Sequence, residues 1–495
     1  MTFLSLNMSV LAVIVPLMAA PICVLLRHSG LAWAWATAIA GITFVLSIGL
    51  LQHIMANGTL VYEMGGWDGP WGIVYHIDEV SALVVMIVAA IATVVMPYAK
   101  LSIEREIPKE RHYLVYCMFL LCMAGLIGMA VTGDAFNLFV FLEVSSLSSY
   151  VLISLGNDRR ALTASLRYLI IGTLGATFYV IGLGMIYMMT GSLNMTDLAT
   201  SLPEVQDTQT IHVAFAFVII GFGLKLALFP LHIWLPNAYT YAPSAVTAFL
   251  AATATKVAVY AMLRLIYTVF GDVNPFETYG LRGVMIALAL LGMFAGSLLA
   301  IFQTNVKRLL AYSSIAQVGY MVLGISIGNA IALEGGIIHM FNHALMKGGL
   351  FMAMGCVFYM VGSTDLKDMA GMGKRMPLTA AAFVIGGFAL VGTPLTVGFI
   401  SKFYLVQGAL AEGWWPIAFM IMFASLLAVI YVWRVVEVMY FQKPADGDLS
   451  YNEAPIAMLI PTYVLIGAAV YFGTDATLTS EISLNAAQTL LGGSK

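Results

Sequence analysis

Two lysines lie inside apolar runs that are long enough to cross a lipid bilayer. Lys225 and Lys256 belong to the stretch 221–256, GFGLKLALFPLHIWLPNAYTYAPSAVTAFLAATATK. An ionisable side chain costs at least ~2.5 kcal/mol at the centre of a membrane helix. The three prolines between the lysines disfavour a continuous helix. The stretch therefore predicts a broken membrane helix whose buried charges serve a function.

A carboxylate also lies inside an apolar run earlier in the chain. Glu143 lies near the middle of FNLFVFLEVSSLSSYVL. We expect it to pair with Lys225, because each charge stabilises the other and breaking the pair favours proton release from the lysine. The alternative is a protonated Glu143 that hydrogen-bonds to Ser145, Ser146 or a carbonyl group. Intramembrane ionisable residues are more often functional, which favours the pair.

The segment HMFNHALMK places His339, His343 and Lys347 on one helix face, each four residues from the next. No cysteine or carboxylate cluster completes a metal site there, so we expect no metal. Imidazole both donates and accepts hydrogen bonds near neutral pH, so two histidines near Lys256 would extend a proton path. Lys347 is a further candidate residue for proton translocation. The alternatives are ordinary core histidines and a Lys347 that contacts a backbone carbonyl.

A second break, Gly392-Thr393-Pro394, precedes Lys402. Such a break frees backbone carbonyls to face a cavity. We therefore predict one row of groups across the membrane interior: Glu143, Lys225, Lys256, His339, His343 and Lys402. His232, between two prolines, is either a gate to this row or an interfacial residue.

Lys256 lies about a dozen residues from either end of its predicted helix, too far for its ammonium group to reach the interface. A structural ion pair is the alternative, but no nearby acid is evident. Arg434 and Glu437, by contrast, are three residues apart and are expected to pair.

The remaining charges near helix ends have simpler interpretations. Arg264 and Arg282 lie near predicted outer ends and are expected to extend to the interface. Asp78, Glu79 and Asp134 open helices there. They could line an ion entry, but solvated helix starts that complement the helix dipole are the simpler explanation.

Composition sets the class of protein. Of 495 residues, 61% are hydrophobic and 9% are charged, with a mean hydropathy of +0.94. Soluble proteins carry about 25% charged residues, so the chain is predicted to be a polytopic membrane protein. The net charge of −3 and the lack of a basic tail indicate no nucleic-acid partner. The four cysteines are scattered in apolar runs, which predicts no disulfide framework and no bound cofactor.

Fourteen apolar windows of about 20 residues predict an all-α fold with about 14 transmembrane helices. The windows are approximately 6–26, 31–52, 77–98, 113–131, 135–155, 163–190, 211–237, 243–268, 281–302, 307–328, 335–361, 378–410, 416–440 and 455–473. The turns predicted on the inner side hold thirteen of the 22 lysines and arginines, whereas the outer loops 53–76, 191–210 and 269–280 hold none. Positive residues favour the inner side, so both termini are predicted outside. The first window is predicted to be a retained helix, not a signal peptide.

The two broken helices indicate a repeat. Residues 113–268 and 281–440 each hold five windows, and the fourth window of each block is broken. Five is an odd number, so the second block is predicted to be inverted relative to the first. Helices 1–3 (residues 1–112) precede the blocks, and helix 14 with a tail (residues 441–495) follows them.

Several motifs in order resemble one known family. They are GDAFNLFVFLEVSSLSSYVL, LKLALFPLHIWLPNAYTYAPSAVTAFLAATATK, VKRLLAYSSIAQVGYM, HMFNHALMKGGLF and GTPLTVGFISKF. These look like the antiporter-like subunits shared by Mrp-type Na⁺/H⁺ antiporters, respiratory complex I and membrane-bound hydrogenases, over about residues 75–440. Within this family the chain is most similar to the D-type subunits of Mrp antiporters. One complex I subunit type has glutamate at the position of Lys402, which disfavours an assignment of this chain to that subunit type. Another complex I subunit type has lysine there, as the D-type subunits do, so this position alone does not separate the two.

The resemblance implies a transporter subunit of the cell inner (plasma) membrane, not an enzyme. It implies that Glu143 and Lys225 are the coupling pair, Lys256 the central relay, His339 and His343 the link between halves, and Lys402 the terminal carrier. Small and antiporter-like membrane subunits would be its partners, and H⁺ and Na⁺ its ions. The alternatives are a proton-pumping subunit of a redox-driven complex, a solute symporter and a purely structural subunit.

Overall fold

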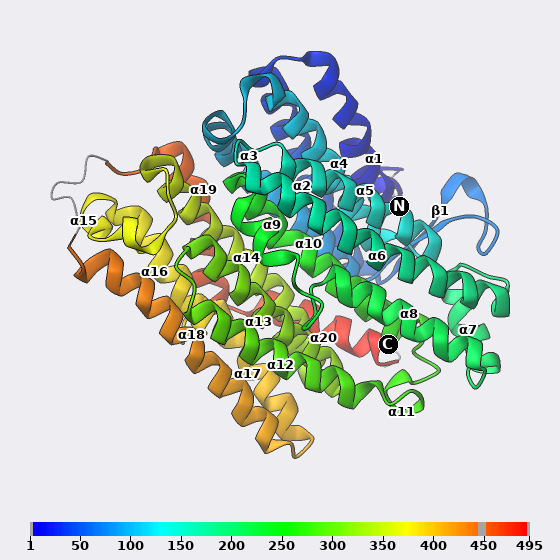
Figure 1. The fold of residues 1–495 in the computed structure, drawn as a ribbon. Coiled ribbons are helices and arrows are strands. Elements are labelled where there is room, and N and C mark those ends of the chain that lie inside the picture. Colours follow the sequence, from blue (N-terminus) through cyan, green and yellow to red (C-terminus); the bar gives the residue numbers. More distant parts are fainter. Residues whose placement is uncertain (1–2, 444–451, 493–495) are drawn as a thin grey trace.

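Long apolar helices run side by side through the molecule (Figure 1). The computed structural model describes residues 3–443 and 452–492. In that part of the chain, twelve helices are long and apolar enough to cross a membrane. They are α1 (Phe3–Leu26), α2 (Ser29–Asn57), α3 (Glu79–Glu106), α4 (His112–Val131), α5 (Ala135–Ser154), α6 (Arg159–Thr190), α10 (Ser244–Arg264), α12 (Leu281–Ile301), α13 (Val306–Ile327), α14 (Ala330–Val361), α18 (Trp415–Phe441) and α19 (Ile456–Thr474). The predicted all-α polytopic membrane fold is confirmed.

The two predicted breaks are present. α8 (Gln209–Lys225) is followed by turns and then by α9 (Leu235–Tyr241), and α16 (Pro377–Val391) is followed by α17 (Val397–Ala411). Each break holds a non-glycine residue with left-handed backbone, Ala227 (φ 60°) and Leu395 (φ 68°). This conformation is costly for a residue with a Cβ, so tertiary contacts must hold both breaks in place. Fourteen crossings result if each broken helix counts once, and that exact number stays a prediction.

The helices form two blocks of five segments. The first block is α4, α5, α6, α8–α9 and α10, and the second is α12, α13, α14, α16–α17 and α18. The blocks share a pattern of contacts. In the first, α4 packs on α5 and α6 packs on the broken helix α8–α9; in the second, α12 packs on α13 and α14 packs on the broken helix α16–α17. α10 packs on α14 and so joins the blocks. The exact block boundaries stay predictions.

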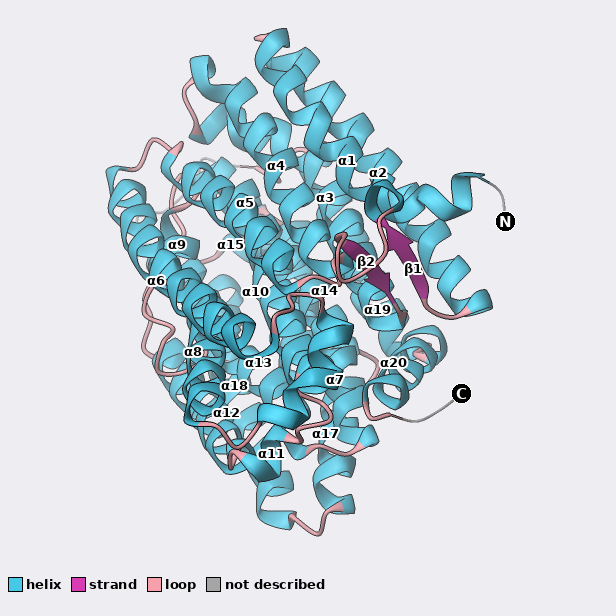
Figure 2. Cartoon of the chain, turned by 90° about the vertical axis from the view of Figure 1, so that its right-hand side faces the viewer, coloured by secondary structure: helices cyan, strands magenta, loops and turns pink. Residues whose placement is uncertain are grey.

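Short elements gather at one end of the bundle, which faces the viewer in Figure 2. They are the antiparallel strands β1 (Leu60–Glu63) and β2 (Val74–Ile77), with Leu60 opposite Ile77, and the helices α7 (Met195–Val205), α11 (Pro275–Thr278) and α20 (Thr477–Leu490). α20 was predicted only as a tail, but it packs on α14 and α3. Its serines and threonines give it too little apolar character for a membrane window, which is why the sequence did not reveal it. The other short elements are η1 (Met64–Gly66), η2 (Lys109–Arg111), a π-helical turn η3 (Leu265–Val269), η4 (Leu366–Met369) and α15 (Met372–Arg375).

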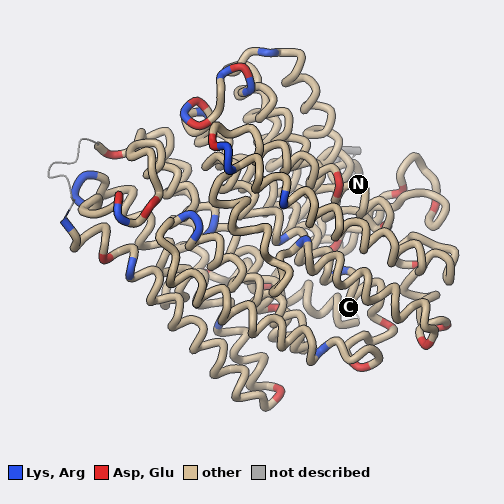
Figure 3. Tube along the Cα trace, viewed as in Figure 1, with Lys and Arg blue, Asp and Glu red and all other residues tan. Residues whose placement is uncertain are grey.

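Charge divides the two ends of the bundle (Figure 3). Lys and Arg gather in the turns at the upper and left edges of the view, here called the basic end. The end that carries β1, α7 and α11 has acidic turns and is here called the acidic end. Both ends of the described chain lie at the acidic end (Figure 1). Which side of the membrane this end faces stays a prediction.

Candidate functional site

Glu143 and Lys225 lie in contact between α5 and α8. Lys225 Nζ is 3.6 Å from Glu143 Oε1, and it donates hydrogen bonds to Ser146 Oγ at 2.8 Å and to Tyr150 OH at 3.5 Å. The lysine side chain is 5% exposed and the carboxylate 23%. The ammonium group is thus fixed by three side chains of one helix, and the carboxylate keeps access to its surroundings.

Glycines allow the helices around this pair to approach closely. A Cβ on Gly221 of α8 would lie 2.7 Å from the carbonyl oxygen of Gly175 on α6, so neither position has room for a side chain. A Cβ on Gly172 would lie 2.0 Å from the Tyr150 hydroxyl. Small residues at such crossings permit close helix contact in membranes. They bring Lys225 of α8 within reach of Glu143 and Tyr150 on α5.

A small cavity lies between Lys225 and α10. Its volume is about 20 Å³, and Ser146, Lys225, Ala254 and Ala258 are among its lining residues. A cavity needs roughly 10–15 Å³ to hold one water molecule. Ala254 and Ala258 flank Lys256 in the sequence, so the cavity brings the Lys225 ammonium to the helix that carries the next lysine of the predicted row.

Lys256 is completely buried in the middle of α10. Its ammonium group donates to the Ala251 carbonyl and to Thr255 Oγ1 at 3.3 Å, both on its own helix. Among the described residues, no carboxylate pairs with it. The charge is therefore balanced only by local dipoles, which is costly in a low-dielectric interior.

The two histidines of α14 stack with ring centroids 6.1 Å apart. His339 contacts Ser401 Oγ at 2.8 Å and Gln317 Oε1 at 2.9 Å through its two ring nitrogens. His343 is fully buried, and neither ring nitrogen has a hydrogen-bond partner within residues 3–443 and 452–492. Buried polar atoms are rarely left unpaired, so each one invites an explanation. A proton carrier that exchanges partners would provide one.

Lys347, one turn further along α14, has its own partners. Its ammonium group donates to the Leu310 carbonyl oxygen at 2.7 Å and to Ser313 Oγ on α13. This is the helix-packing contact that the sequence left open as an alternative. Its role in proton translocation stays a prediction.

Lys402 lies directly beside the second break. Its ammonium group donates to the carbonyl oxygens of Leu390 at 3.0 Å and Val391 at 2.8 Å, which the end of α16 leaves free. It also lies 4.9 Å from the centroid of the Tyr320 ring. Gly398 has no room for a Cβ, which would lie 1.9 Å from the Ala389 carbonyl oxygen. The break therefore forms a local cation site from backbone dipoles.

The surroundings of Lys402 link it to the histidines on one side and to an apolar cavity on the other. Ser401, its neighbour, contacts His339, and the Tyr320 ring lies 5.6 Å from the His339 ring. The cavity, of about 350 Å³, lies between α17 and α18 and is lined mainly by apolar side chains. The second half of the predicted row is thus connected through Ser401 and Tyr320.

His232 lies in the first break and is buried. Its ring stacks on Phe229 at 5.2 Å, and its Nδ1 lacks a hydrogen-bond partner among the described residues. The structure does not bring it into direct contact with Lys225 or Lys256. Its role as a gate stays a prediction.

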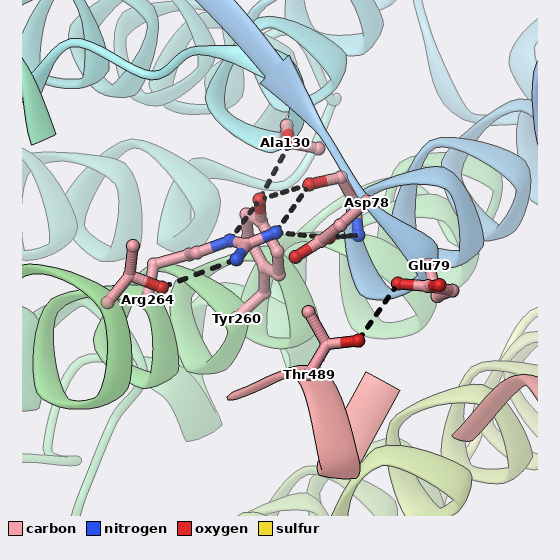
Figure 4. Close-up of polar contacts among 8 residues, drawn as sticks. Asp78, Glu79, Ala130, Tyr260, Arg264 and Thr489 are labelled. Atoms are coloured by element: carbon pink, nitrogen blue, oxygen red, sulfur yellow. Dashed lines mark hydrogen bonds and ion pairs between the residues drawn. The ribbon is translucent and has the colours of Figure 1, made fainter. Parts of the chain in front are cut away.

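Two expectations for charges near helix ends were wrong. Arg264 does not extend to the interface, and Asp78 and Glu79 are not solvated helix starts, because all three are buried. Arg264 and Asp78 form an ion pair (Figure 4). Burial alone would raise the pKa of Asp78, but the adjacent Arg264 charge and its hydrogen bonds hold the pKa below the ordinary value of 3.8. The two residues are 186 positions apart, so no local spacing reveals the contact.

The expected pair of Arg434 and Glu437 is not formed either. Arg434 Nη1 donates to the carbonyl oxygens of Ile301 and, at 3.0 Å, Gln303 at the end of α12. Glu437 is exposed on α18 and is absent from the ion pairs of the described residues. The free carbonyls of a helix C-terminus attract a cation, and here they prevail over a surface pair.

No metal centre is evident in the described part of the chain, where no three His, Cys, Asp or Glu side chains are grouped to hold an ion. All four cysteines are free and buried. Chemically, the arrangement offers proton donors and acceptors inside a dry bundle. The contributions of Tyr320, Gln317 and Ser401 were not foreseen, and Ser146 was considered only as a partner of Glu143 and not of Lys225. Neutral side chains carry little signal in an apolar sequence.

Comparisons with known proteins agree with this architecture. A family model described as "NADH:quinone oxidoreductase/Mrp antiporter, TM" matches residues 132–428. The chain belongs to this family. The matched region holds the whole predicted row, from Glu143 to Lys402.

Two relatives of the family extend over nearly the whole chain. The N subunit of the NADH-quinone oxidoreductase of Desulforudis audaxviator is 42% identical over 483 residues, which are 94% of this chain and 95% of the relative. The D subunit of the Na(+)/H(+) antiporter of Alkalihalophilus pseudofirmus is 33% identical and covers 98% of this chain and 97% of the relative. Both branches of the family are therefore represented among the relatives, and the predicted resemblance to the family is confirmed.

Solved structures agree with the fold. A chain of an archaeal membrane-bound sulfane sulfur reductase matches with a TM-score of 0.90 at 32% identity, over 98% of this chain and 97% of that chain. A chain of the Mrp complex from a Dietzia species matches with a TM-score of 0.90 at 24% identity, over 99% and 98%. The protein is thus a transmembrane subunit of the type found in multisubunit membrane complexes.

Proposed function

We propose that the chain translocates protons as a subunit of a multisubunit monovalent cation (Na⁺)/proton antiporter. The observation that carries this proposal is the Glu143–Lys225 contact of 3.6 Å, deep in a bundle that also buries Lys256, His339, His343 and Lys402. Protons would move sideways along this row, and Lys347 would take part in the same translocation. The 33% identity to the D subunit of a Na⁺/H⁺ antiporter supports the cation partner.

The physical basis is the cost of isolated charge in hydrocarbon. A buried lysine without a carboxylate partner is easily deprotonated by its surroundings, whereas one beside a carboxylate holds its proton more firmly. Movement of the Glu143 carboxylate toward or away from Lys225 would therefore bias the proton between positions of the row. Cation movement elsewhere in the complex would drive this displacement.

A second candidate is a proton-pumping subunit of a redox-driven complex. The 42% identity to the N subunit of an NADH-quinone oxidoreductase and the 32% identity to the sulfane sulfur reductase chain favour it. The same row would then carry protons, and the redox centres would reside in partner subunits. In both cases the partners are other membrane subunits, and the complex would reside in the cell inner (plasma) membrane with both termini outside.

Purification of the complex from native membranes distinguishes the two candidates. If only small and antiporter-like membrane subunits accompany the chain, and if vesicles that hold the complex exchange Na⁺ for H⁺, the first proposal holds. Accompanying iron–sulfur or flavin proteins, with proton transport that depends on an electron donor and not on Na⁺, would replace it with the second. An active isolated chain that carries an organic solute would contradict both.

A further inference from the structure

A large polar cavity lies at the acidic end of the bundle, away from the predicted row. Its volume is about 580 Å³, and its walls come from β2, the end of α10, the turns around α11 and the end of α20. Thr268, Asp272 and Thr489 are among the side chains that line it. A cavity of this size with charged and hydroxyl walls is suited to water and small ions.

The floor of the cavity is a closed network around one buried arginine (Figure 4). Arg264 pairs with Asp78 and donates to Ser81 Oγ at 2.8 Å, to Tyr260 OH at 3.0 Å and to Thr268 Oγ1 at 3.3 Å. Both Asp78 and Arg264 also line the cavity. The guanidinium group therefore has one side toward the cavity and the other toward the interior of the bundle.

Hydroxyl groups continue the network inward. Tyr260 OH lies 2.8 Å from Ser81 Oγ and donates to the Ala130 carbonyl oxygen at 2.7 Å. Tyr260 and Arg264 follow Lys256 on α10 by four and eight residues. This spacing places all three on one helix face, with about 6 Å of rise between neighbours.

Both ends of α10 open into polar cavities. Its first turn adjoins a cavity of about 420 Å³ at the basic end, where Lys307 Nζ donates to the Ala242 carbonyl oxygen at 3.0 Å and Glu106 accepts a hydrogen bond from Ser244 N. Its last turn passes into the π-helical turn η3, a feature that often marks functional sites. Lys256 therefore lies between two polar cavities on a single helix.

We propose that the cavity at the acidic end is the aqueous mouth through which protons pass between Lys256 and the solution, and that the Arg264–Asp78 pair closes its inner end. A guanidinium group fixed across a narrow passage repels protons. Passage therefore requires two movements. Arg264 must turn away from Tyr260 and Ser81, and the Lys256 ammonium, which donates to the Ala251 carbonyl and to Thr255 Oγ1, must swing toward the Tyr260 hydroxyl. This inference rests on the proposed proton translocation. It places the opening of the proton path to the solution beside α10 and not beside Lys402.

Cysteine labelling tests the inference on the assembled complex in vesicles whose acidic end faces the reagent. Thr268→Cys introduces a thiol of similar size beside Arg264, and Thr200→Cys provides a matched control on the exposed surface of α7 at the same end. The probe is a membrane-impermeant, positively charged methanethiosulfonate. Because the native cysteines are buried, the unmodified complex serves as a second control.

We expect the reagent to label the Thr268→Cys complex and to lower its proton flux at least tenfold, while the Thr200→Cys complex is labelled without loss. Full proton flux after labelling at position 268, or a thiol there that the reagent cannot reach, would overturn the inference. If Thr268→Cys itself impairs assembly, Thr489→Cys on the α20 wall gives the same two outcomes. Lack of proton flux in the unlabelled, unmodified complex would instead contradict the proposed function.

Discussion

Replacing Glu143 with glutamine removes one charge and leaves the shape of the side chain almost unchanged. At 3.6 Å and an effective dielectric of about 20, the attraction between Glu143 and Lys225 amounts to about 5 kcal/mol. Since 1.4 kcal/mol corresponds to a factor of ten, the pair can bias proton occupancy at Lys225 by up to about three orders of magnitude. Oε1 of Glu143 is buried, but 23% of the whole side chain is exposed, so this energy is an upper limit. We therefore expect Glu143→Gln to lower proton flux at least tenfold.

The assay is Na⁺-dependent proton exchange in vesicles, followed with a pH-sensitive dye and normalised to the amount of assembled complex. Glu437→Gln is the matched control, because Glu437 is an exposed acid on α18 outside the row and the same change there should leave the flux unaltered. The double variant Glu143→Gln/Lys225→Met should be little worse than either single variant, since the two groups act as a unit. Flux within twofold of the unmodified complex in Glu143→Gln would refute the reasoning.

Two further predictions separate function from stability. Lys256→Met and Lys402→Met should each lower proton flux at least tenfold without lowering the melting temperature of the complex. The reason is that an apolar side chain of similar length removes the cost of a buried ammonium group that has no carboxylate partner. A lower melting temperature with full proton flux would show that the lysine is structural and not a proton carrier. Asp78→Asn leaves a buried guanidinium unpaired and should lower the melting temperature. The pKa of Asp78 is depressed in the folded protein, so its stabilising effect is fully present above pH 3.8 and is lost only as the pH falls below that value. The difference in melting temperature between Asp78→Asn and the unmodified complex should thus stay constant from pH 8 to pH 5 in a fluorescence melting assay. A difference that disappears by pH 5 would contradict the assignment of Asp78 as an ionised partner of Arg264.

Much of the fold follows from hydropathy, because a bilayer requires apolar segments of defined length. The windows over α4, α10 and α13 predicted helices at nearly the observed places, and the prolines near 230 and 394 marked the breaks. The helix α20 escaped prediction because it lies against the ends of other helices and needs no apolar window.

The site was predictable only where a charge stood alone in an apolar run. Lys225, Lys256 and Lys402 stand out for that reason, and so does Glu143. The pairing of Arg264 with Asp78 was missed, because each residue lies near a helix end and has an ordinary explanation there. Only the packing of α10 on α3 brings the two together.

The most direct test of the account replaces Lys225, Lys256 and Lys402 together with methionine. The proton flux of the assembled complex is then measured in sealed vesicles under the driving force that the native complex uses. The account predicts a complex that assembles and melts as the unmodified one does but transports no protons. Proton flux close to that of the unmodified complex would contradict it, because the buried lysines would then serve only to hold the helices together.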